Sequence, residues 1–219
     1  MNKDWSLLNK LMQKQLKKKD TFNLGIQTLI LLRNQLMLEI DTWIKRVDEQ
    51  DFHKLPFINS KGYECKNIAY SLWHIFRIED IVTHSLIQKN EQVFYMNNYH
   101  KRMNAKIETT GNELKGIQIS EFTQDLDINE LYNYIHDVKT HTDSYLEQLN
   151  FNDLFYHFNQ TDIERIKISN NVSTDQDAYW LIDYWCSKNI LGLMQMPLSR
   201  HWIMHVEASI RIINRLNKK

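Results

Sequence analysis

The stretch Asn23–Val47, NLGIQTLILLRNQLMLEIDTWIKRV, decides the fold class of this 219-residue chain. Its large apolar side chains recur at spacings of three and four residues, at Leu29, Leu32, Leu36, Ile40, Trp43 and Val47. Because an α-helix has about 3.6 residues per turn, this spacing places them on one face. The most apolar part, Leu24–Leu32, ends at Arg33 and is far shorter than the ~20 residues that cross a bilayer. The stretch therefore predicts a long helix with one buried face, not a membrane span.

Three more stretches predict long helices. Residues 67–89 carry an apolar stripe, and so does a helix that begins after Asp127, where Glu130 completes most of a capping box. The two stripes are Ile68, Leu72, Ile75, Val82 and Leu86, with Glu79 on the same line, and Ile128, Leu131, Ile135, Val138, Tyr145 and Leu149. The last helix begins at Pro197, because proline lacks only an N–H that is unpaired at the first helical position, and it ends near Leu216.

Shorter segments connect these four helices. They are residues 5–19, a short amphipathic helix; 90–126, a polar connection with Gly111 and Gly116; 151–174, an irregular connection; and 175–190, an aromatic helix capped by Ser173 or Thr174. The connections are long, so we expect some of them to carry accessory helices.

Glycine and proline are scarce in the chain. It has 5 Gly and 2 Pro, where average usage predicts roughly 15 and 11. A β-rich fold needs these residues for its many tight turns. The composition and the four long periodic stretches therefore predict an all-α fold. We expect a four-helix bundle with accessory helices in the long connections, forming one domain over residues 1–219.

Charge and cysteine content restrict the function classes. The 27 Lys and Arg balance the 27 Asp and Glu, so no excess of cations favours a nucleic-acid partner. Neither a secretory signal nor a membrane anchor is expected from the N-terminal residues. Cys65 and Cys186 form no CxxC motif, so we expect two reduced, unreactive thiols in a cytoplasmic protein.

Two histidines on the last helix form the strongest candidate site. His201 and His205 lie on the stripe that contains Leu198, Ala208, Ile212 and Leu216. Residues four apart on a helix are about 5–6 Å apart at Cβ, so both imidazoles can reach one ion. An HxxxH spacing alone is a weak signal. The alternative is a pair of core histidines that hydrogen-bond to Tyr, Asp or carbonyl groups.

A metal site needs a third ligand from a facing helix. The candidates are His74, His84, His136 and His141. His136 lies well off the apolar stripe of its helix, and His141 is only slightly closer. His74 shares a side with Tyr70, Ile78 and Ile81, and that face is apolar enough to point inward. We therefore expect His74, His201 and His205 to form the site.

Two motifs in these helices resemble a known family. Residues 67–80, NIAYSLWHIFRIED, resemble the second helix of the DinB-like (YfiT-like) metal-binding four-helix-bundle superfamily, and residues 196–208, MPLSRHWIMHVEA, resemble its last helix. The resemblance implies a metal site of His74, His201 and His205 that holds zinc or nickel, with water completing the coordination. It also implies a metal-dependent transferase or hydrolase, a small-molecule substrate such as a low-molecular-weight thiol, and a homodimer.

The chemistry leaves two hypotheses open. Three neutral imidazoles with an open position suit an enzyme, because a bound divalent ion lowers the pKa of water or of a substrate thiol. The alternative is a non-catalytic helical bundle whose metal is structural or sensory. A fourth protein ligand, such as Glu79 or a cysteine, would favour that alternative.

Other residues near the predicted site are weaker candidates for a functional role. Glu79 follows His74 by about 140° of helix rotation, so we expect at most a hydrogen bond to a metal ligand. A core carboxylate paired with Arg33 or a tyrosine is the more ordinary interpretation. The accessory helix brings Asp183 and Tyr184 as further candidates. Four tryptophans are candidates for pocket walls, although such residues usually belong to the core: Trp73, Trp180, Trp185 and Trp202.

Overall fold

The computed structural model describes residues 2–58 and 66–218, so Cys65 lies outside the described residues. The described part is all-helical, and its only β-type pairing is an isolated bridge between His157 and Asn189. This confirms the all-α prediction. None of its helices is long and apolar enough to cross a membrane.

Four long helices coincide with the periodic stretches. They are α2 (Phe22–Arg46), α3 (Ile68–Asp80), α7 (Ile128–Gln148) and α11 (His201–Leu216). Two of them are longer than their α-helical bounds, because π-helical turns extend α3 over Ile81–Gln88 and precede α11 over Met196–Arg200. Pro197 lies in the first turn of the latter segment, as its missing N–H predicts.

The caps of two helices agree only in part with the sequence patterns. Asp127 accepts a hydrogen bond from the backbone of Glu130 at 3.0 Å and so begins α7 as predicted. The cap of α9 (Gln176–Cys186) is Asp175, whose side chain accepts from the backbone N–H of Asp177. Ser173 and Thr174 were the wrong choice, because the helix begins later than expected.

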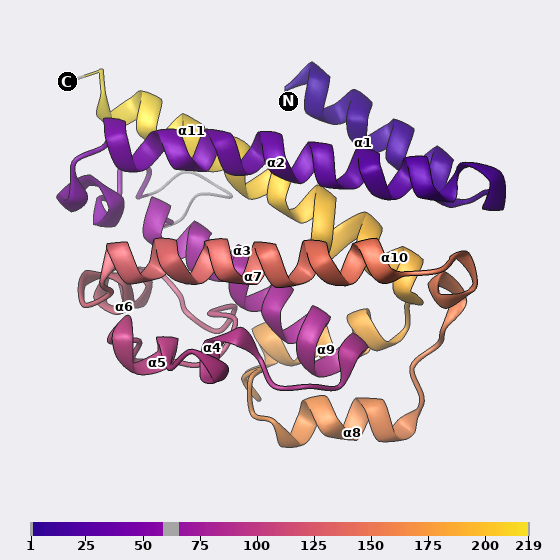
Figure 1. The fold of residues 1–219 in the computed structure, drawn as a ribbon. Helices are drawn as coiled ribbons and strands as arrows, with labels where there is room; N and C mark the ends of the chain where they lie inside the picture. The colour runs from indigo at the N-terminus through magenta and orange to yellow at the C-terminus, as the bar shows by residue number, and fades with distance from the viewer. Residues whose placement is uncertain (1, 59–65, 219) are drawn as a thin grey trace.

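The long helices pack on one another, and α1 (Lys3–Leu16) lies against α2. In Figure 1 the α1 helix folds back beside α2, while α3 contacts both α7 and α11. Helix α2 also contacts α7 and α11. The accessory helices α8 (Gln160–Ile168) and α9 lie in this view on the side away from α1 and α2.

The connections contain more helix than the sequence patterns indicate. Between α3 and α7 lie α4 (Val93–Met96), α5 (Tyr99–Arg102) and α6 (Ile117–Gln124), and between α9 and α11 lies α10 (Ile190–Gln195). The short 3₁₀ turns are Lys19–Thr21, Glu49–His53 and Phe151–Phe155. Helix α8 contradicts the prediction of an irregular 151–174 segment. Its sequence signal was a capping box, in which the side chains of Asn159 and Asp162 each accept from the other's backbone.

A layer of buried polar groups separates two apolar clusters of the core. One cluster fills the half around the end of α2 and the start of α7, and the other fills the half around the start of α2 and the end of α7. Between them Arg33 of α2 donates to Glu79 of α3 at 2.7 and 2.9 Å, and to Asp143 of α7 at 2.6 Å. Helix α11 joins the layer through Trp202, whose Nε1 donates to Glu79 at 2.7 Å.

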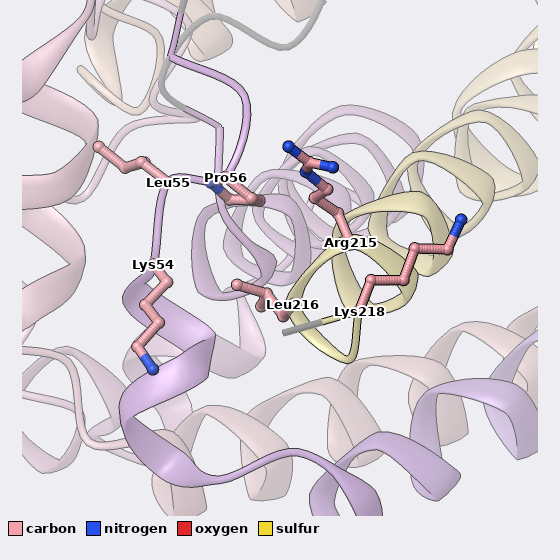
Figure 2. Close-up of a pocket in the computed structure, with 6 residues that line it drawn as sticks. All are labelled: Lys54, Leu55, Pro56, Arg215, Leu216 and Lys218. Atoms are coloured by element: carbon pink, nitrogen blue, oxygen red, sulfur yellow. The ribbon is translucent and has the colours of Figure 1, made fainter.

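The end of α11 borders a surface cavity of about 470 Å³ (Figure 2). Its walls are the side chains of Lys54, Leu55, Pro56, Arg215, Leu216 and Lys218. None of the histidines predicted to bind a metal lines this cavity. The candidate site lies elsewhere, on the facing surfaces of α3 and α11.

Candidate metal centre

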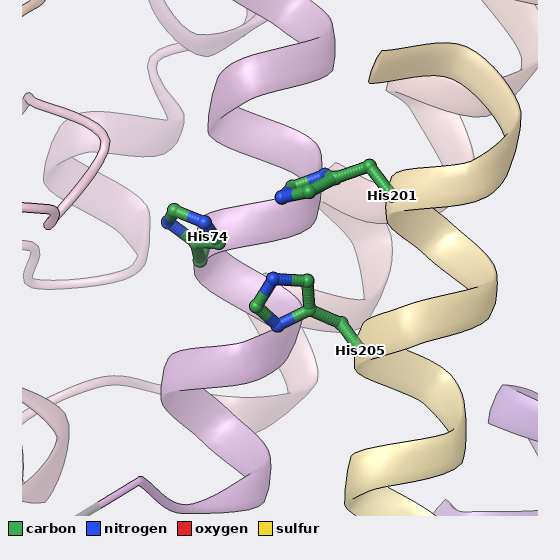
Figure 3. Close-up of side chains that lie close together, drawn as sticks. All are labelled: His74, His201 and His205. Atoms are coloured by element: carbon green, nitrogen blue, oxygen red, sulfur yellow. The ribbon is translucent and has the colours of Figure 1, made fainter. Parts of the chain in front are cut away.

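The structure brings His74, His201 and His205 together. Each offers one ring nitrogen, and these three nitrogens lie within 4.8 Å of one another. The ring centroids are 5.0 Å apart for His74 and His201, 4.8 Å for His74 and His205, and 4.5 Å for the pair on α11. Figure 3 shows the three rings converging on one space between α3 and α11. Two nitrogens bound to one ion at about 2.0–2.1 Å lie at most about 4.2 Å apart, so a small inward movement of the rings would let one ion contact all three.

The histidines lie at the margin of the buried face of α11, not at its centre as the stripe pattern predicts. The fully buried Trp202, Val206 and Ser209 each lie one position after a residue of that stripe, although Ile212 of the stripe is fully buried as well. His201 is buried, whereas His205 is only partly buried. This offset matters because it places the imidazoles where the core meets two cavities.

Loop carbonyls hold the site-facing side of α3. Four consecutive carbonyl oxygens, those of residues 108–111, each accept a hydrogen bond from an α3 side chain. The donors, in the order of the carbonyls, are Arg77, Trp73, His74 and Tyr70. The loop between α5 and α6 is thereby fixed along one face of α3 for more than one turn.

His74 gains a defined tautomer from this loop. Its Nδ1 lies 2.9 Å from the carbonyl oxygen of Thr110. Because a carbonyl oxygen can only accept, Nδ1 must carry the hydrogen, and Nε2 keeps its lone pair. Histidines that bind metals usually donate their other N–H to such a group, which orients the ring.

Gly111 allows the loop to approach α3 closely. It has a φ of +77°, and a Cβ at this position would lie 3.0 Å from Cε2 of Tyr70. Tyr70 in turn stacks on His74, with the ring centroids 5.6 Å apart and an angle of 15° between the planes. Glycine is required here because both the backbone conformation and the lack of space disfavour a side chain.

The three imidazoles are neutral at pH 7. Burial lowers the pKa of His74 to about 4, and it also holds the pKa values of His201 and His205 well below their usual range. The charge of Lys66 lowers all three pKa values further. In addition, Nδ1 of His201 is buried without a hydrogen-bond partner. A set of neutral, inward-facing imidazoles with an unsatisfied nitrogen fits a divalent ion such as zinc.

Glu79 is not part of this cluster. Both of its carboxylate oxygens are occupied by Arg33, and Oε2 also accepts from the indole of Trp202. The pairing with Arg33, the ordinary interpretation of this residue, is the one observed. Glu79 does not hydrogen-bond to any of the three histidines, although Trp202 follows His201 directly.

The other histidines lie outside the cluster. His136 is exposed and contacts Asp41 at 2.9 Å, and His84 lies 2.9 Å from Asp80. The ring of His141 is 5.8 Å from that of His84. The choice of His74 as the partner of the α11 pair therefore agrees with the geometry.

A cavity of about 310 Å³, which we call the aromatic cavity, opens beside the cluster. It is lined by Trp180, Tyr184 and Trp185 of α9 and by His74 and His201. Asp183 is exposed and does not line it. Trp73 and Trp202 belong to the core instead, where Trp73 packs on Phe94 and Phe122 and Trp202 on Phe76.

A second cavity of about 330 Å³, the basic cavity, also borders the cluster. Its polar walls include Lys66, Tyr70 and Lys115 together with His74 and His205. Asn112 lines both cavities. The sequence patterns did not reveal Lys66, Asn112 or Lys115, because none of them lies on a periodic stripe and their positions depend on the loop.

Cys186 is unsuited to act as a nucleophile. It is partly buried, and burial raises its pKa to about 11, so the thiol is protonated at pH 7. This agrees with the expectation of an unreactive thiol.

Comparisons with known proteins do not name a family for the chain. No protein-family model matches it, and no curated protein or solved structure is significantly similar to it. The functional argument therefore depends on the geometry of the site.

Proposed function

We propose that the protein is a metal-dependent enzyme of the DinB/YfiT-like type, built on a four-helix bundle of α2, α3, α7 and α11. His74, His201 and His205 would hold a divalent zinc or nickel ion. The observation that carries the proposal is the convergence of three neutral ring nitrogens within 4.8 Å, beside two cavities. The polar layer to which α2, α3, α7 and α11 each contribute a group supports the four-helix arrangement.

An open coordination position supports catalysis over a purely structural role. In the described part of the chain, no carboxylate or thiol joins the three histidines. A structural zinc site is usually closed by four protein ligands, whereas a catalytic site keeps one position for water or substrate. A bound divalent ion would supply a positive charge that lowers the pKa of a water or thiol placed there.

The absence of an acidic wall favours thiol transfer over hydrolysis. No Asp or Glu is among the described residues that line either cavity. Tyr70 is a poor base, because its hydroxyl donates to the carbonyl of Gly111 and burial raises its pKa. Activating water requires a proton acceptor close by, whereas a thiol, with its lower pKa, can lose its proton to solvent. We therefore propose a thiol-dependent transferase as the principal activity and a hydrolase as the second.

Metal analysis of untagged protein tests the proposal. We expect close to one zinc or nickel ion per chain after dialysis against a limiting concentration of each metal. The His74→Ala and His201→Ala variants should each lose most of this metal. His136→Ala is the matched control, because His136 is exposed and contacts only Asp41. Metal content that is unaffected by the first two variants would contradict the proposal.

The non-catalytic alternative makes a different prediction. A structural site would need a fourth protein ligand, and Glu79 is already bound to Arg33. A Cys65→Ser variant that lost the metal would support this closed site. If Cys65→Ser keeps its metal and the wild-type protein transfers a thiol to an electrophile, the enzymatic proposal stands.

A further inference from the structure

We infer that the aromatic cavity and the basic cavity are the two ends of one substrate site. The site would bind a small molecule with an aromatic or flat apolar group at one end and an anionic group at the other. The reactive atom would lie between them, beside the histidines. This inference rests on the proposed function for the identity of the reactive centre, and it adds the chemical class of the substrate.

The two cavities meet at the same residues. His74 and Asn112 line both, while His201 lines the aromatic cavity and His205 the basic one. A molecule centred on the histidine cluster can thus extend into both. The volumes of about 310 and 330 Å³ are each of the size that small-molecule sites occupy, roughly 300–1,000 Å³.

The aromatic cavity has apolar surface that is exposed to solvent. The indole of Trp180 is 50% exposed although it packs edge-on against Tyr184, with ring centroids 5.6 Å apart. Its Nε1 already donates to the carbonyl of Asp177, so the exposed part of the ring is apolar. Met196 and Pro197 also line this cavity. A flat apolar group would cover this surface and be stabilised by its removal from water.

The basic cavity favours an anion. Lys66 and Lys115 line it, and its described walls contain no acidic side chain. Lys66 lines this cavity together with His74 and His205, so its charge lies beside the cluster. Lys115 forms an exposed ion pair with Asp177 of α9. Because exposed ion pairs are weak, Lys115 can exchange Asp177 for an anionic ligand.

Asn112, which lines both cavities, offers its side-chain amide N–H as a hydrogen-bond donor. Its Oδ1 accepts from the hydroxyl of Thr110 at 2.8 Å, and this contact orients the amide. No hydrogen bond joins its Nδ2 to any other described residue. Because Asn112 lines both cavities, we expect this N–H group to bind an acceptor near the middle of the ligand.

Three matched thiols test the two-ended site. The full probe is 2-mercapto-3-phenylpropanoate, which carries a benzyl group, a thiol and a carboxylate on one carbon. In 1-phenylpropane-2-thiol a methyl group replaces the carboxylate, and in 2-mercaptopropanoate a hydrogen replaces the phenyl ring. Calorimetric titration of zinc-loaded protein should show that the full probe binds about tenfold or more tightly than either truncated probe.

Substitutions of Lys66 and Trp180 test which residue binds each end of the probe. Lys66→Met should weaken both carboxylate probes by about tenfold and leave 1-phenylpropane-2-thiol within about twofold, while Lys66→Arg keeps the preference. Trp180→Ala should weaken both phenyl probes and leave 2-mercaptopropanoate unchanged. Lys101→Met and Tyr179→Ala are the controls, because both residues are exposed and neither lines a cavity. Differences in thiol acidity cancel, since each variant meets the same three probes.

The outcomes separate this inference from the proposed function. Zinc binding with equal affinity for all three probes overturns the two-ended site and leaves the metal centre intact. Equal weakening of all probes by Lys66→Met overturns it as well. The same titrations are repeated on protein without zinc. Selectivity that persists in a protein that binds no zinc supports the two-ended site and contradicts the metal-dependent enzyme.

Discussion

His74 shows how one hydrogen bond can prepare a metal ligand. Thr110 accepts from Nδ1, so the lone pair on Nε2 is available for an ion. Without that acceptor the ring could rotate or adopt the other tautomer, and both would weaken a three-histidine site. His201 has no comparable partner, because its Nδ1 is buried and unsatisfied.

The low histidine pKa values predict an acid-sensitive metal-free protein. Burial lowers the pKa of His74 from 6.5 to about 4, so between these values the unfolded chain binds more protons than the folded one. Stability is therefore full above pH 6.5 and falls as the pH drops toward 4. Between pH 7 and pH 5 we expect a loss of about 2 kcal/mol from His74 alone, measured by urea unfolding after chelation.

A variant isolates this contribution. His74→Gln should have a flatter dependence of the unfolding free energy on pH, whereas the exposed His136→Gln should keep the slope of the wild type. Equal slopes for wild type and His74→Gln would contradict a neutral, buried His74.

We expect the Glu79→Gln substitution to lower the stability of the folded protein without preventing metal binding. Burial opposes the charge of Arg33, but Glu79 and Asp143 raise the pKa of Arg33 above its usual range, so the guanidinium stays charged. In Glu79→Gln this buried cation loses its fully buried counter-charge, while Asp143 remains. We expect unfolding to become easier by about 3 kcal/mol, measured by urea denaturation. The folded variant should still bind about one metal ion per chain at saturating zinc, because Glu79 is not among the clustered ligands.

At the scale of elements, the segment between α5 and α6 packs along α3 and fixes the orientation of several α3 side chains. The carbonyls of residues 108–111 bind four α3 side chains, and one of these is His74. The segment also supplies Asn112 and Lys115 to the cavities. It was expected to be an irregular connection with Gly111 and Gly116, and both glycines do have positive φ.

Gly111→Ala should loosen this segment and weaken the metal site. The substitution places a Cβ at a φ of +77° and 3.0 Å from the ring of Tyr70, so we expect a loss of about 1–2 kcal/mol in stability. Metal affinity should fall as well, because the carbonyl of Thr110 moves away from His74. Competition with a coloured chelator measures it.

Gly192→Ala is the matched control for this prediction. Gly192 lies in α10 without a positive φ, and a Cβ there would lie 3.1 Å from Cβ of Lys188, a distance close to that at Gly111 but without an unfavourable φ. It should leave the metal affinity unchanged. The same affinity in both variants would indicate that the loop does not position His74.

At the scale of the whole molecule, the metal site lies beside the polar layer that divides the core. Arg33 also donates to the carbonyl of Leu198 at 3.1 Å, within the π-helical segment that leads into α11. Glu79 binds Trp202 on the other side of His201. The layer thereby anchors α11 on both sides of the first histidine of the pair. Metal binding and global stability should consequently be coupled.

Metal loading should stabilise the folded protein. An ion that binds only the folded state at a free concentration about 100 times its dissociation constant contributes about 2.7 kcal/mol. We expect a higher melting temperature with zinc than after chelation, and no such difference in His201→Ala. A melting temperature independent of zinc would contradict a metal site in the core.

Some of the fold could be predicted from particular residues. The periodic apolar stripes of residues 23–47 and 67–89, and the cap at Asp127, each led to a helix that the structure contains. Helix α8 was missed because its apolar residues are few, so only its capping box indicated it. The HxxxH spacing and the inward face of His74 were sufficient to select the three histidines that converge.

The sequence by itself determined the all-helical class, the limits of the four long helices to within a few residues and the side of its own helix on which each of the three histidines lies, because these depend on spacing along a single helix. Only the tertiary structure decided the tautomer of His74, the pairing of Glu79 with Arg33 and the two cavities beside the cluster. Those features join residues from different helices and from a loop without periodicity. Contacts of that kind depend on how the elements pack, and no local pattern encodes them.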